Sequence, residues 1–440
     1  MQSYFYQLAD DITANLQGGE RFTSTFLAEN SDFVRINEGA VRQAGSVAQR
    51  SLTIDLITGM RHTSESIALS GDLSIDRAWI NAMLVRSREK LPHLPEDPHH
   101  LYATDVRSSE QHGKNRLAKS SDTIPAILNA GSNRDMVGLY ASGGMYAGFA
   151  NSFGQRNWFS SFNHNLEWSF YFQDDKAVKS SYAGFEWDSA VFQEKVAWAN
   201  EQLDILIHPS HTIQPGRYRV YISPYALYDV VGMLSWGCFG LRSHRTKQTP
   251  LLRMLEGGEK LHSAVTMREN TYAGIAPNFQ DAGFIKPDYV SLIEKGELCN
   301  TLVSPRSAKE YGVPTNGASN YETPESIEIL GGEIETDQIL RQLDTGIYIN
   351  NVWYLNYSDR SMCRMTGMTR FATFWVENGI VKAPLAVMRF DETLYRMLGE
   401  NLIGLTANRD LVMDSTTYQA RSTESGRLPG ILVGDFSFTL

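Results

Sequence analysis

Cysteine is scarce in this chain of 440 residues, which contains Cys238, Cys299 and Cys363 and no others. An odd number of widely separated cysteines predicts neither a disulfide framework nor a cysteine-rich metal site, so we expect free thiols in the cytoplasm. Long apolar runs are also missing, because no stretch approaches the ~20 residues of a membrane-spanning helix. The first residues lack the basic and apolar regions of a signal peptide. We therefore predict neither secretion nor contact with a membrane.

Clusters of basic residues are absent as well. The chain has 40 Lys and Arg against 50 Asp and Glu, which gives a net charge of −10. Binding to the phosphates of DNA or RNA requires clustered Lys and Arg side chains, so we expect no direct contact with nucleic acid. With 42% hydrophobic residues, a chain of this length can form a large core without disulfides, and its length predicts two domains.

Histidines are present but do not form a recognised metal motif. None of the 10 histidines is followed by Glu, and none lies after His262, which excludes a His-Glu-x-x-His zinc site. His208 and His211 lie in a proline-bounded segment, and His99 and His100 in a proline-rich one. We expect solvated side chains at these positions rather than ligands, and we predict no metal site on this chain.

Motifs for other chemistries are missing too. The glycine-rich segment Gly138–Gly148 lacks the Lys-Ser or Lys-Thr of a P-loop, which favours strand glycines. There is no Gly-x-Ser-x-Gly nucleophile motif. Arg360 and Arg364 would lower the pKa of the Cys363 thiol, and a half-buried loop cysteine is the alternative interpretation. Residue chemistry alone therefore identifies no activity.

Helical and alternating periods of apolar residues divide the first half of the chain into helices and an antiparallel meander. The predicted segments are helix Tyr4–Leu16, strands within Thr23–Ile57, helix Asp76–Lys90, a polar loop from about residue 91 to 122, strands within Met136–Trp187 and helix Ser189–Leu206. The segment His208–Gly216, with two prolines and a glycine, is the best linker candidate. We place an N-terminal domain at residues 1–208 and a C-terminal domain at residues 216–440.

The second half also mixes helices and strands. Its predicted segments are strand Arg217–Ser223, helix Asp229–Leu241, hairpins within residues 289–303 and 371–383, helix Leu394–Leu402 and strand Leu428–Phe438. Asn378-Gly379 is the strongest hairpin signal, because both residues tolerate a positive φ. The whole pattern predicts an α+β protein.

Several short blocks occur in the order typical of one protein family. They are Phe33–Gly39, Ala150-Asn151-Ser152-Phe153-Gly154, Asp281-Ala282-Gly283, Leu292–Leu298, Ser307–Gly312, Gly346–Ile349 and Phe374–Gly379 with Pro384. Over roughly 400 residues, the chain resembles the TldD/PmbA family, also called modulators of DNA gyrase. The resemblance implies an N-terminal α/β domain and a C-terminal domain built on a mixed, barrel-like sheet with helices.

The resemblance also implies a connection with proteolysis. TldD-type members carry His-Glu-x-x-x-His on a helix of the second domain and a zinc-binding Cys near the C-terminus. They degrade unfolded or small peptides inside a cavity formed with a TldE-type partner. In this chain the motif positions fall on Gly232, Met233 and Gly237, which offer no suitable zinc ligand, and no cysteine follows Cys363. The resemblance therefore points to the TldE/PmbA-like branch, with zinc on a TldD-like partner and no intrinsic metallopeptidase activity expected.

This resemblance suggests a non-catalytic subunit that completes a peptide-binding chamber, in which Gly232, Gly237 and Gly240 permit close packing of the former zinc helix. Exposed sheet edges would hold an extended peptide by added-strand pairing. The residues that we expect in the peptide-binding face are Asn151, Ser152, Trp236, Asn350, Asn351 and Tyr354, with surface loops as the alternative interpretation. Two other functions stay open: a homodimeric peptide-binding protein without enzymatic activity, and a peptidase that acts alone through Cys363 or a pocket serine.

Overall fold

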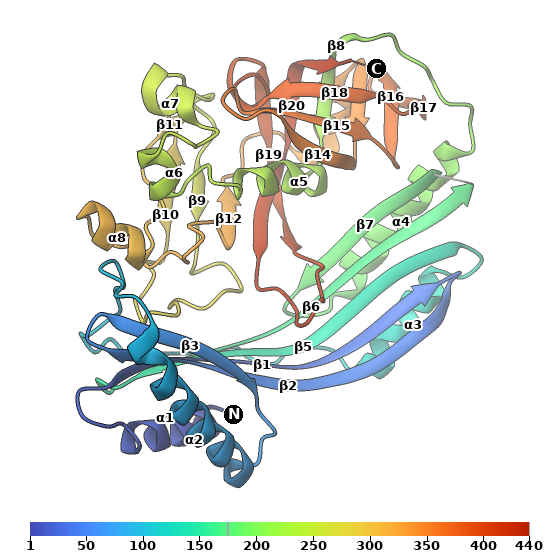
Figure 1. Ribbon diagram of the computed structural model, residues 1–440. Helices are drawn as coiled ribbons and strands as arrows, with labels where there is room; N and C mark the ends of the chain where they lie inside the picture. Colours follow the sequence, from blue (N-terminus) through green and yellow to red (C-terminus); the bar gives the residue numbers. More distant parts are fainter. Residues whose placement is uncertain (174–175, 440) are drawn as a thin grey trace.

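Two β-sheets, one from each half of the chain, form the framework of the molecule (Figure 1). The computed structural model describes residues 1–173 and 176–439. The helices are α1 (Gln2–Ala14), α2 (Leu73–Lys90), the 3₁₀ helix η1 (Leu91–His93), α3 (Ser120–Ala130), α4 (Ser189–Leu206), α5 (Pro224–Leu234), α6 (Leu241–Arg245), α7 (Leu252–Gly257), α8 (Pro305–Tyr311), the 3₁₀ helix η2 (Thr336–Gln338), α9 (Ile339–Leu343) and the π-helical turn η3 (Arg396–Glu400). No helix among the described residues combines the length and the apolar character that crossing a membrane requires.

The first sheet has seven strands in the order β3-β2-β1-β5-β6-β4, and β7 also pairs with β6. Its strands are β1 (Arg21–Asn37), β2 (Ala40–Thr58), β3 (Arg61–Ala68), β4 (Ser109–His112), β5 (Asp135–Asn151), β6 (Arg156–Gln173) and β7 (Lys176–Gly184). Every pair is antiparallel except β4 with β6, which is parallel. The predicted antiparallel N-terminal sheet is therefore confirmed.

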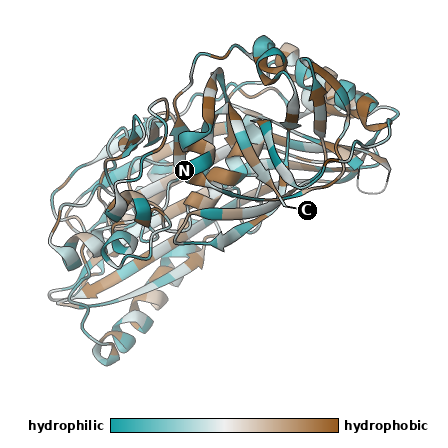
Figure 2. Cartoon of the chain, turned by 90° about the horizontal axis from the view of Figure 1, so that it is seen from above, coloured by the Kyte–Doolittle hydropathy of each residue, from teal (hydrophilic) through white to brown (hydrophobic). Residues whose placement is uncertain are grey.

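One face of this sheet is covered by α1 and α2, which lie below it in Figure 1. The helical spacing of Phe5, Leu8 and Ile12 places them on one buried face of α1. They pack in a core with β1 and β2 residues such as Phe22 and Leu52. Along the strands, hydrophobic and hydrophilic segments alternate (Figure 2), as expected when neighbouring side chains point to opposite faces.

The second sheet has 13 strands and mixed pairing. Its strands are β8 (Gly216–Ile222), β9 (Met267–Glu269), β10 (Val290–Glu294), β11 (Glu297–Leu298), β12 (Ser326–Ile329), β13 (Gly346–Ile349), β14 (Val352–Asp359), β15 (Arg364–Thr369), β16 (Thr373–Glu377), β17 (Ile380–Pro384), β18 (Arg389–Thr393), β19 (Leu402–Met413) and β20 (Ser425–Phe438). The mixed C-terminal sheet is as expected, and within the described strands it stays open between β11 and β17 rather than closing into a barrel.

Three predicted segments differ from the structure. The helix expected at Asp229–Leu241 is α5, which begins at Pro224 and ends at Leu234, because Gly237 has a φ of 87° that no α-helix contains. The loop expected at residues 91–122 contains η1, β4 and the start of α3. The helix expected at Leu394–Leu402 starts as predicted, with Leu394 and Tyr395 leading into the π-helical turn η3, but it ends at Glu400, since Gly399 has non-helical angles and β19 starts at Leu402.

A buried cluster joins the two halves of the chain. Trp168 and Phe192 from the first half pack in one core with Tyr348, Phe374 and Leu432 from the second half. The loop between β19 and β20 also reaches the first sheet (Figure 1), where the side-chain amide of Asn165 donates to the carbonyl oxygen of Asp414 over 3.3 Å. The two sheets therefore share part of their hydrophobic core.

Candidate functional site

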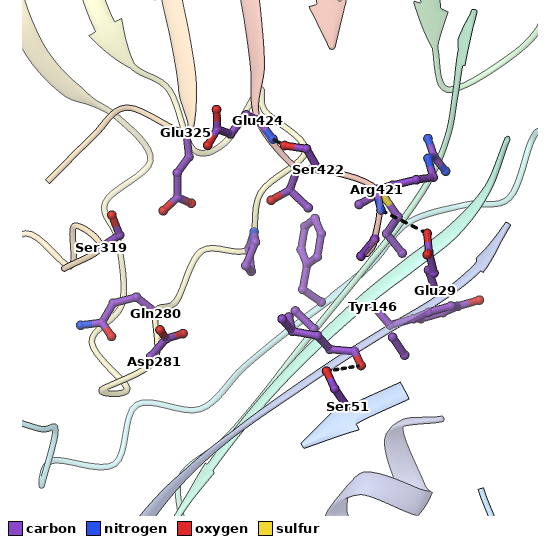
Figure 3. A pocket seen from close by; sticks show the side chains of 18 of the residues that line it. Glu29, Ser51, Tyr146, Gln280, Asp281, Ser319, Glu325, Arg421, Ser422 and Glu424 are labelled. Carbon is purple, nitrogen blue, oxygen red and sulfur yellow. Dashed lines mark hydrogen bonds between the residues drawn. The ribbon is translucent and has the colours of Figure 1, made fainter. Parts of the chain in front are cut away.

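A cavity of about 730 Å³ lies between the first sheet and three loops of the second half (Figure 3). Strands β1, β2, β5 and β6 and the end of β3 supply one wall, and residues 277–286, 319–325 and 419–424 supply the others. A volume in this range is typical of sites that bind a small molecule or a short stretch of peptide, roughly 300–1,000 Å³.

The sheet side of the cavity is largely apolar. Leu27, Ala147 and Phe159 are direct cross-strand neighbours on β1, β5 and β6, so they form a continuous strip of the cavity wall. Phe279 packs against Ala147 and Phe159 in one small buried cluster. This wall can accept apolar side chains with little demand on their identity.

Arg421 brings a buried positive charge to the opposite side. Its guanidinium donates to the backbone and side-chain oxygens of Asn163, and its backbone N–H points at a Glu29 carboxylate oxygen at 3.4 Å (Figure 3). Burial lowers the pKa of Arg421 to about 10, with Glu29 opposing the shift, so the side chain stays a cation at neutral pH. A buried cation of this kind favours a ligand that offers carbonyl or carboxylate oxygens.

The third wall carries an ion pair and a buried carboxyl behind it. Lys286 Nζ lies 2.6 Å from a Glu325 carboxylate oxygen, and Lys286 is almost fully buried. Glu269 lies beneath Glu325 and accepts hydrogen bonds from the backbone N–H groups of Glu325 and Ser326. Burial, with the nearby charge of Glu325, raises the pKa of Glu269 to about 7.

An unpaired strand edge leads into the cavity. On β2, residues Ala40–Ala48 are all exposed and pair with β1 on one side. On the other side, β3 pairs only with Ser51–Thr58, so within the described residues the edge from Ala40 to Gln49 has no strand partner. Gln49, Arg50 and Ser51 at the end of this edge line the cavity. Free backbone N–H and C=O groups at such an edge are a template for an added strand.

The positions that correspond to the zinc motif do not form a metal site. Gly232 and Met233 lie near the end of α5, and Gly237 lies beyond it, so the three positions do not share one helix. Neither glycine has a side-chain donor, and the buried Met233 thioether is a poor ligand for Zn²⁺. The residues present here do not fit zinc.

Close packing explains only some of the glycines in this region. A Cβ atom at Gly232 would meet nothing within 4 Å, so the expectation of tight packing at that position is wrong. At Gly240 a Cβ atom would come within 3.0 Å of the Glu322 side chain, and at Gly237 within 3.0 Å of the Arg360 guanidinium.

The Cys363 thiol is not activated. Its hydrogen bond to Cys238 and its burial raise the pKa of Cys363 well above the usual range, which outweighs the opposite effect of Arg360. Both cysteines are fully buried, and the Cys238 sulfur lies 3.5 Å from the Tyr357 hydroxyl. Arg360 lowers the pKa of this thiol as suggested, but the hydrogen bond to Cys238 and burial dominate, so the net shift is upward.

The residues predicted for the peptide-binding face lie in separate places, outside the lining of the cavity. Asn151 is buried at the end of β5, where its side-chain oxygen accepts from the N–H groups of Phe153 and Gln155. Ser152 follows it, and its hydroxyl oxygen accepts weakly from the Phe22 N–H at 3.4 Å.

The other four predicted residues lie near β13 and β14. Asn350 donates to the Lys179 carbonyl and to the buried side chain of Asn351. Trp236 and Tyr354 are 53% and 74% exposed, which leaves them free for contact with another molecule. Their role in binding peptide stays a prediction.

Sequence reasoning missed the cavity because its walls come from distant segments. Among the residues of the family blocks, Asp281 lines the cavity. Arg421 lies in an irregular loop without periodicity, and nothing in the sequence places it beside Glu29.

Comparison with known proteins identifies the family. A family model described as the PmbA/TldA metallopeptidase C-terminal domain matches residues 215–440, a little more than half of the chain. No curated protein matches the sequence. Among solved structures, TldE from Thermococcus kodakarensis is 12% identical, with a TM-score of 0.81 and coverage of 99% of this chain and 100% of that chain.

Two further structures are similar over nearly their whole length. A candidate modulator of DNA gyrase from Thermotoga maritima is 14% identical, with a TM-score of 0.77 and coverage of 99% of both chains. Another from Bacteroides thetaiotaomicron is 14% identical, with a TM-score of 0.75 and coverage of 99% of this chain and 98% of that chain. At these identities the similarity establishes the fold, and together with the matched family model it confirms that the chain belongs to the PmbA/TldD family.

Proposed function

We propose that this chain is a TldE/PmbA-like, non-catalytic subunit of a cytoplasmic peptidase complex, in which it binds unfolded or small peptides. The observation that supports this most is the unpaired edge of β2, which runs from Ala40 to Gln49 and ends at the cavity. A peptide added to this edge makes main-chain hydrogen bonds, which are independent of sequence, and its side chains enter the apolar part of the cavity.

Cleavage of the peptide is assigned to a partner. Gly232, Met233 and Gly237 give this chain no zinc ligands at the family's catalytic positions, and the buried thiol of Cys363 is unsuited to nucleophilic attack. The proposed partner is a TldD-like subunit that carries zinc. A homodimer that binds peptide without cleaving it is the alternative, since the same strand edge can pair with a second copy of the chain.

Hydrogen–deuterium exchange with a saturating unfolded peptide tests the binding site. We expect amide protons of residues 40–49 and 419–424 to exchange more slowly in the presence of the peptide, because added-strand pairing protects backbone N–H groups. Protection confined to residues 350–357 would assign the peptide to the surface near Tyr354 instead and would overturn the proposed site.

A matched pair of tyrosine variants tests the cavity itself. Tyr321 lines the cavity and is 87% exposed, whereas Tyr272 is 80% exposed and lies outside it. We expect Tyr321→Ala to weaken peptide binding by about tenfold, as for loss of one aromatic contact of about 1.4 kcal/mol. Tyr272→Ala should bind like the wild type in the same fluorescence anisotropy titration.

Native mass spectrometry of the complex from its own source tests the partner. A heteromer with a zinc-bearing relative is expected. A homo-oligomer of this chain that binds peptide without cleaving it would contradict the subunit assignment and would support the alternative.

A further inference from the structure

Asp55, His62 and His100 form a compact group outside the cavity. The β2–β3 register pairs Asp55 with Ser64 and Ile57 with His62, so Asp55 and His62 are diagonal neighbours on one face of the sheet. His100 comes from the loop that follows η1. One potential ligand atom from each of the three residues lies within 4.8 Å of the others.

The three side chains have the geometry of a nearly formed metal site. The two Asp55 carboxylate oxygens lie 3.0 Å from His62 Nδ1 and 3.1 Å from His100 Nε2. The two imidazole rings are parallel, with an angle of 7° and centroids 3.7 Å apart, so both face the same carboxylate. A tetrahedral Zn²⁺ with bonds of about 2.0–2.1 Å holds its ligand atoms roughly 3.3 Å apart. Small shifts of these side chains therefore suffice to admit the ion.

The surroundings of His62 resemble those of a metal-binding histidine. Its second nitrogen, Nε2, lies 3.5 Å from an Asp97 carboxylate oxygen. Asp97 is held in turn by the Arg306 guanidinium at 2.6 Å and by the His99 backbone N–H at 3.0 Å. Histidines that bind a metal usually donate their other N–H to such a carboxylate, which fixes the tautomer. The Asp55, His100 and His62 side chains are 16%, 18% and 30% exposed, so an ion can reach them from solvent.

We propose that Asp55, His62 and His100 bind one Zn²⁺ ion, with Asp97 as a positioning residue. The donors are two imidazole nitrogens and a carboxylate oxygen, a set that suits Zn²⁺. The ion ties the loop that carries Asp97 and His100 to the β2–β3 hairpin. Arg306 and Lys309 of α8 already bind this loop at Asp97 and at the His100 carbonyl, so the site links the first sheet to the second half of the chain. It is independent of the proposed peptide-binding role and of the former zinc-motif positions.

Zinc titration of the full-length, chelator-treated protein tests this site. We expect one Zn²⁺ per chain, and Co²⁺ as a spectroscopic probe should show the absorption of a four-coordinate site. His62→Gln and His100→Gln should each bind at least tenfold more weakly. His99→Gln is the matched control and should bind like the wild type, because His99 contacts Asp97 only through its backbone. Asp97→Asn should keep the stoichiometry and lose about 10- to 100-fold in affinity.

A wild-type protein that binds less than one equivalent of Zn²⁺, or glutamine variants that bind as tightly as the wild type, would overturn the proposal. If a glutamine variant fails to fold by circular dichroism, chemical modification of the wild-type histidines decides the question. Zn²⁺ should then protect His62 and His100, but not His99, from diethyl pyrocarbonate. Equal modification with and without Zn²⁺ would exclude the site. If native mass spectrometry of the complex finds zinc on this chain, the measurement is repeated with His62→Gln, and loss of that zinc would place the ion at the proposed site.

Discussion

At the scale of single residues, the buried carboxyl of Glu269 behind the cavity wall makes the stability of the folded chain depend on pH. Its pKa is about 7 in the folded chain, mainly because of burial, against an ordinary value of 4.5. The folded state therefore binds this proton more tightly than the unfolded state. The contribution to stability is fully present below about pH 4.5 and is lost as the pH rises to about 7, at a total cost of about 3 kcal/mol.

Glu269→Gln is expected to remove this pH dependence. The glutamine side chain stays neutral, and its oxygen can still accept from the Ser326 N–H. Urea unfolding at pH 5 and pH 8 measures the effect, and the variant should lose less stability between these values than the wild type. Glu194→Gln, at an exposed position on α4, serves as the control. Identical pH dependence in wild type and Glu269→Gln would show that Glu269 is already ionised at pH 5.

Two glycines near the former zinc-motif positions should respond in opposite directions to alanine. Gly232 lies in α5 with open space around a Cβ atom, so Gly232→Ala should raise the free energy of unfolding by about 0.5–1 kcal/mol. Gly237 has a φ of 87° and the Arg360 side chain within 3.0 Å of a Cβ atom. Gly237→Ala should lower the free energy of unfolding by about 1–2 kcal/mol in the same urea titration. A loss at Gly232 would mean that this position packs against another surface in solution.

At the scale of elements, the β16–β17 turn depends on two residues with positive φ. Asn378 and Gly379 have φ values of 51° and 72°. A Cβ atom at Gly379 would also lie 3.3 Å from the Leu340 carbonyl oxygen. Gly379→Ala is therefore expected to lower the free energy of unfolding by about 1–2 kcal/mol in urea. Asn378→Gly, which keeps the positive φ accessible, should change it by less than about 0.5 kcal/mol, and equal losses in both variants would contradict this explanation.

Elements with complete local signals are predictable from the sequence. Helix α4 spans Ser189–Leu206 as predicted, because its apolar spacing is regular and Asp188 caps its first turn. The Asn378-Gly379 hairpin was predictable because both turn residues tolerate the positive φ that the turn requires. Helix α5 was misplaced because its start depends on the Ser223 cap and its end on the backbone of Gly237, neither of which changes the apolar period.

Sites assembled from distant segments were not predictable in this way. The cavity unites β1 with a loop near Arg421, and the proposed zinc site unites Asp55 with His100. Such contacts depend on strand register and on loop paths, which local periodicity does not encode. The family resemblance predicted the fold and drew attention to the absent zinc motif, but it did not predict the location of the cavity or of the proposed zinc site.

At the scale of the whole molecule, the shared core between the two sheets has consequences for stability. Trp168, Phe192, Tyr348, Phe374 and Leu432 belong to one buried cluster, although the linker candidate lies between the first two and the last three. Separation of the halves would expose this surface to water. At about 25 cal/mol per Å² of apolar surface, even several such side chains amount to many kcal/mol. Neither half is therefore expected to be stable without the other.

We predict that the full-length chain unfolds in a single cooperative transition despite its two sheets. Differential scanning calorimetry should give one endotherm, and tryptophan fluorescence and far-UV circular dichroism should follow the same curve in urea. Residues 216–440 expressed alone should bind a hydrophobic dye and lack a cooperative transition, because Tyr348 and Phe374 lose the α4 side of their core. Phe374→Ala in the full chain should lower the midpoint of that single transition, in line with a loss of about 3–5 kcal/mol for a buried aromatic side chain. Two separate transitions, with only one of them shifted by Phe374→Ala, would show instead that the halves fold independently and that the cavity between them can open without unfolding either sheet.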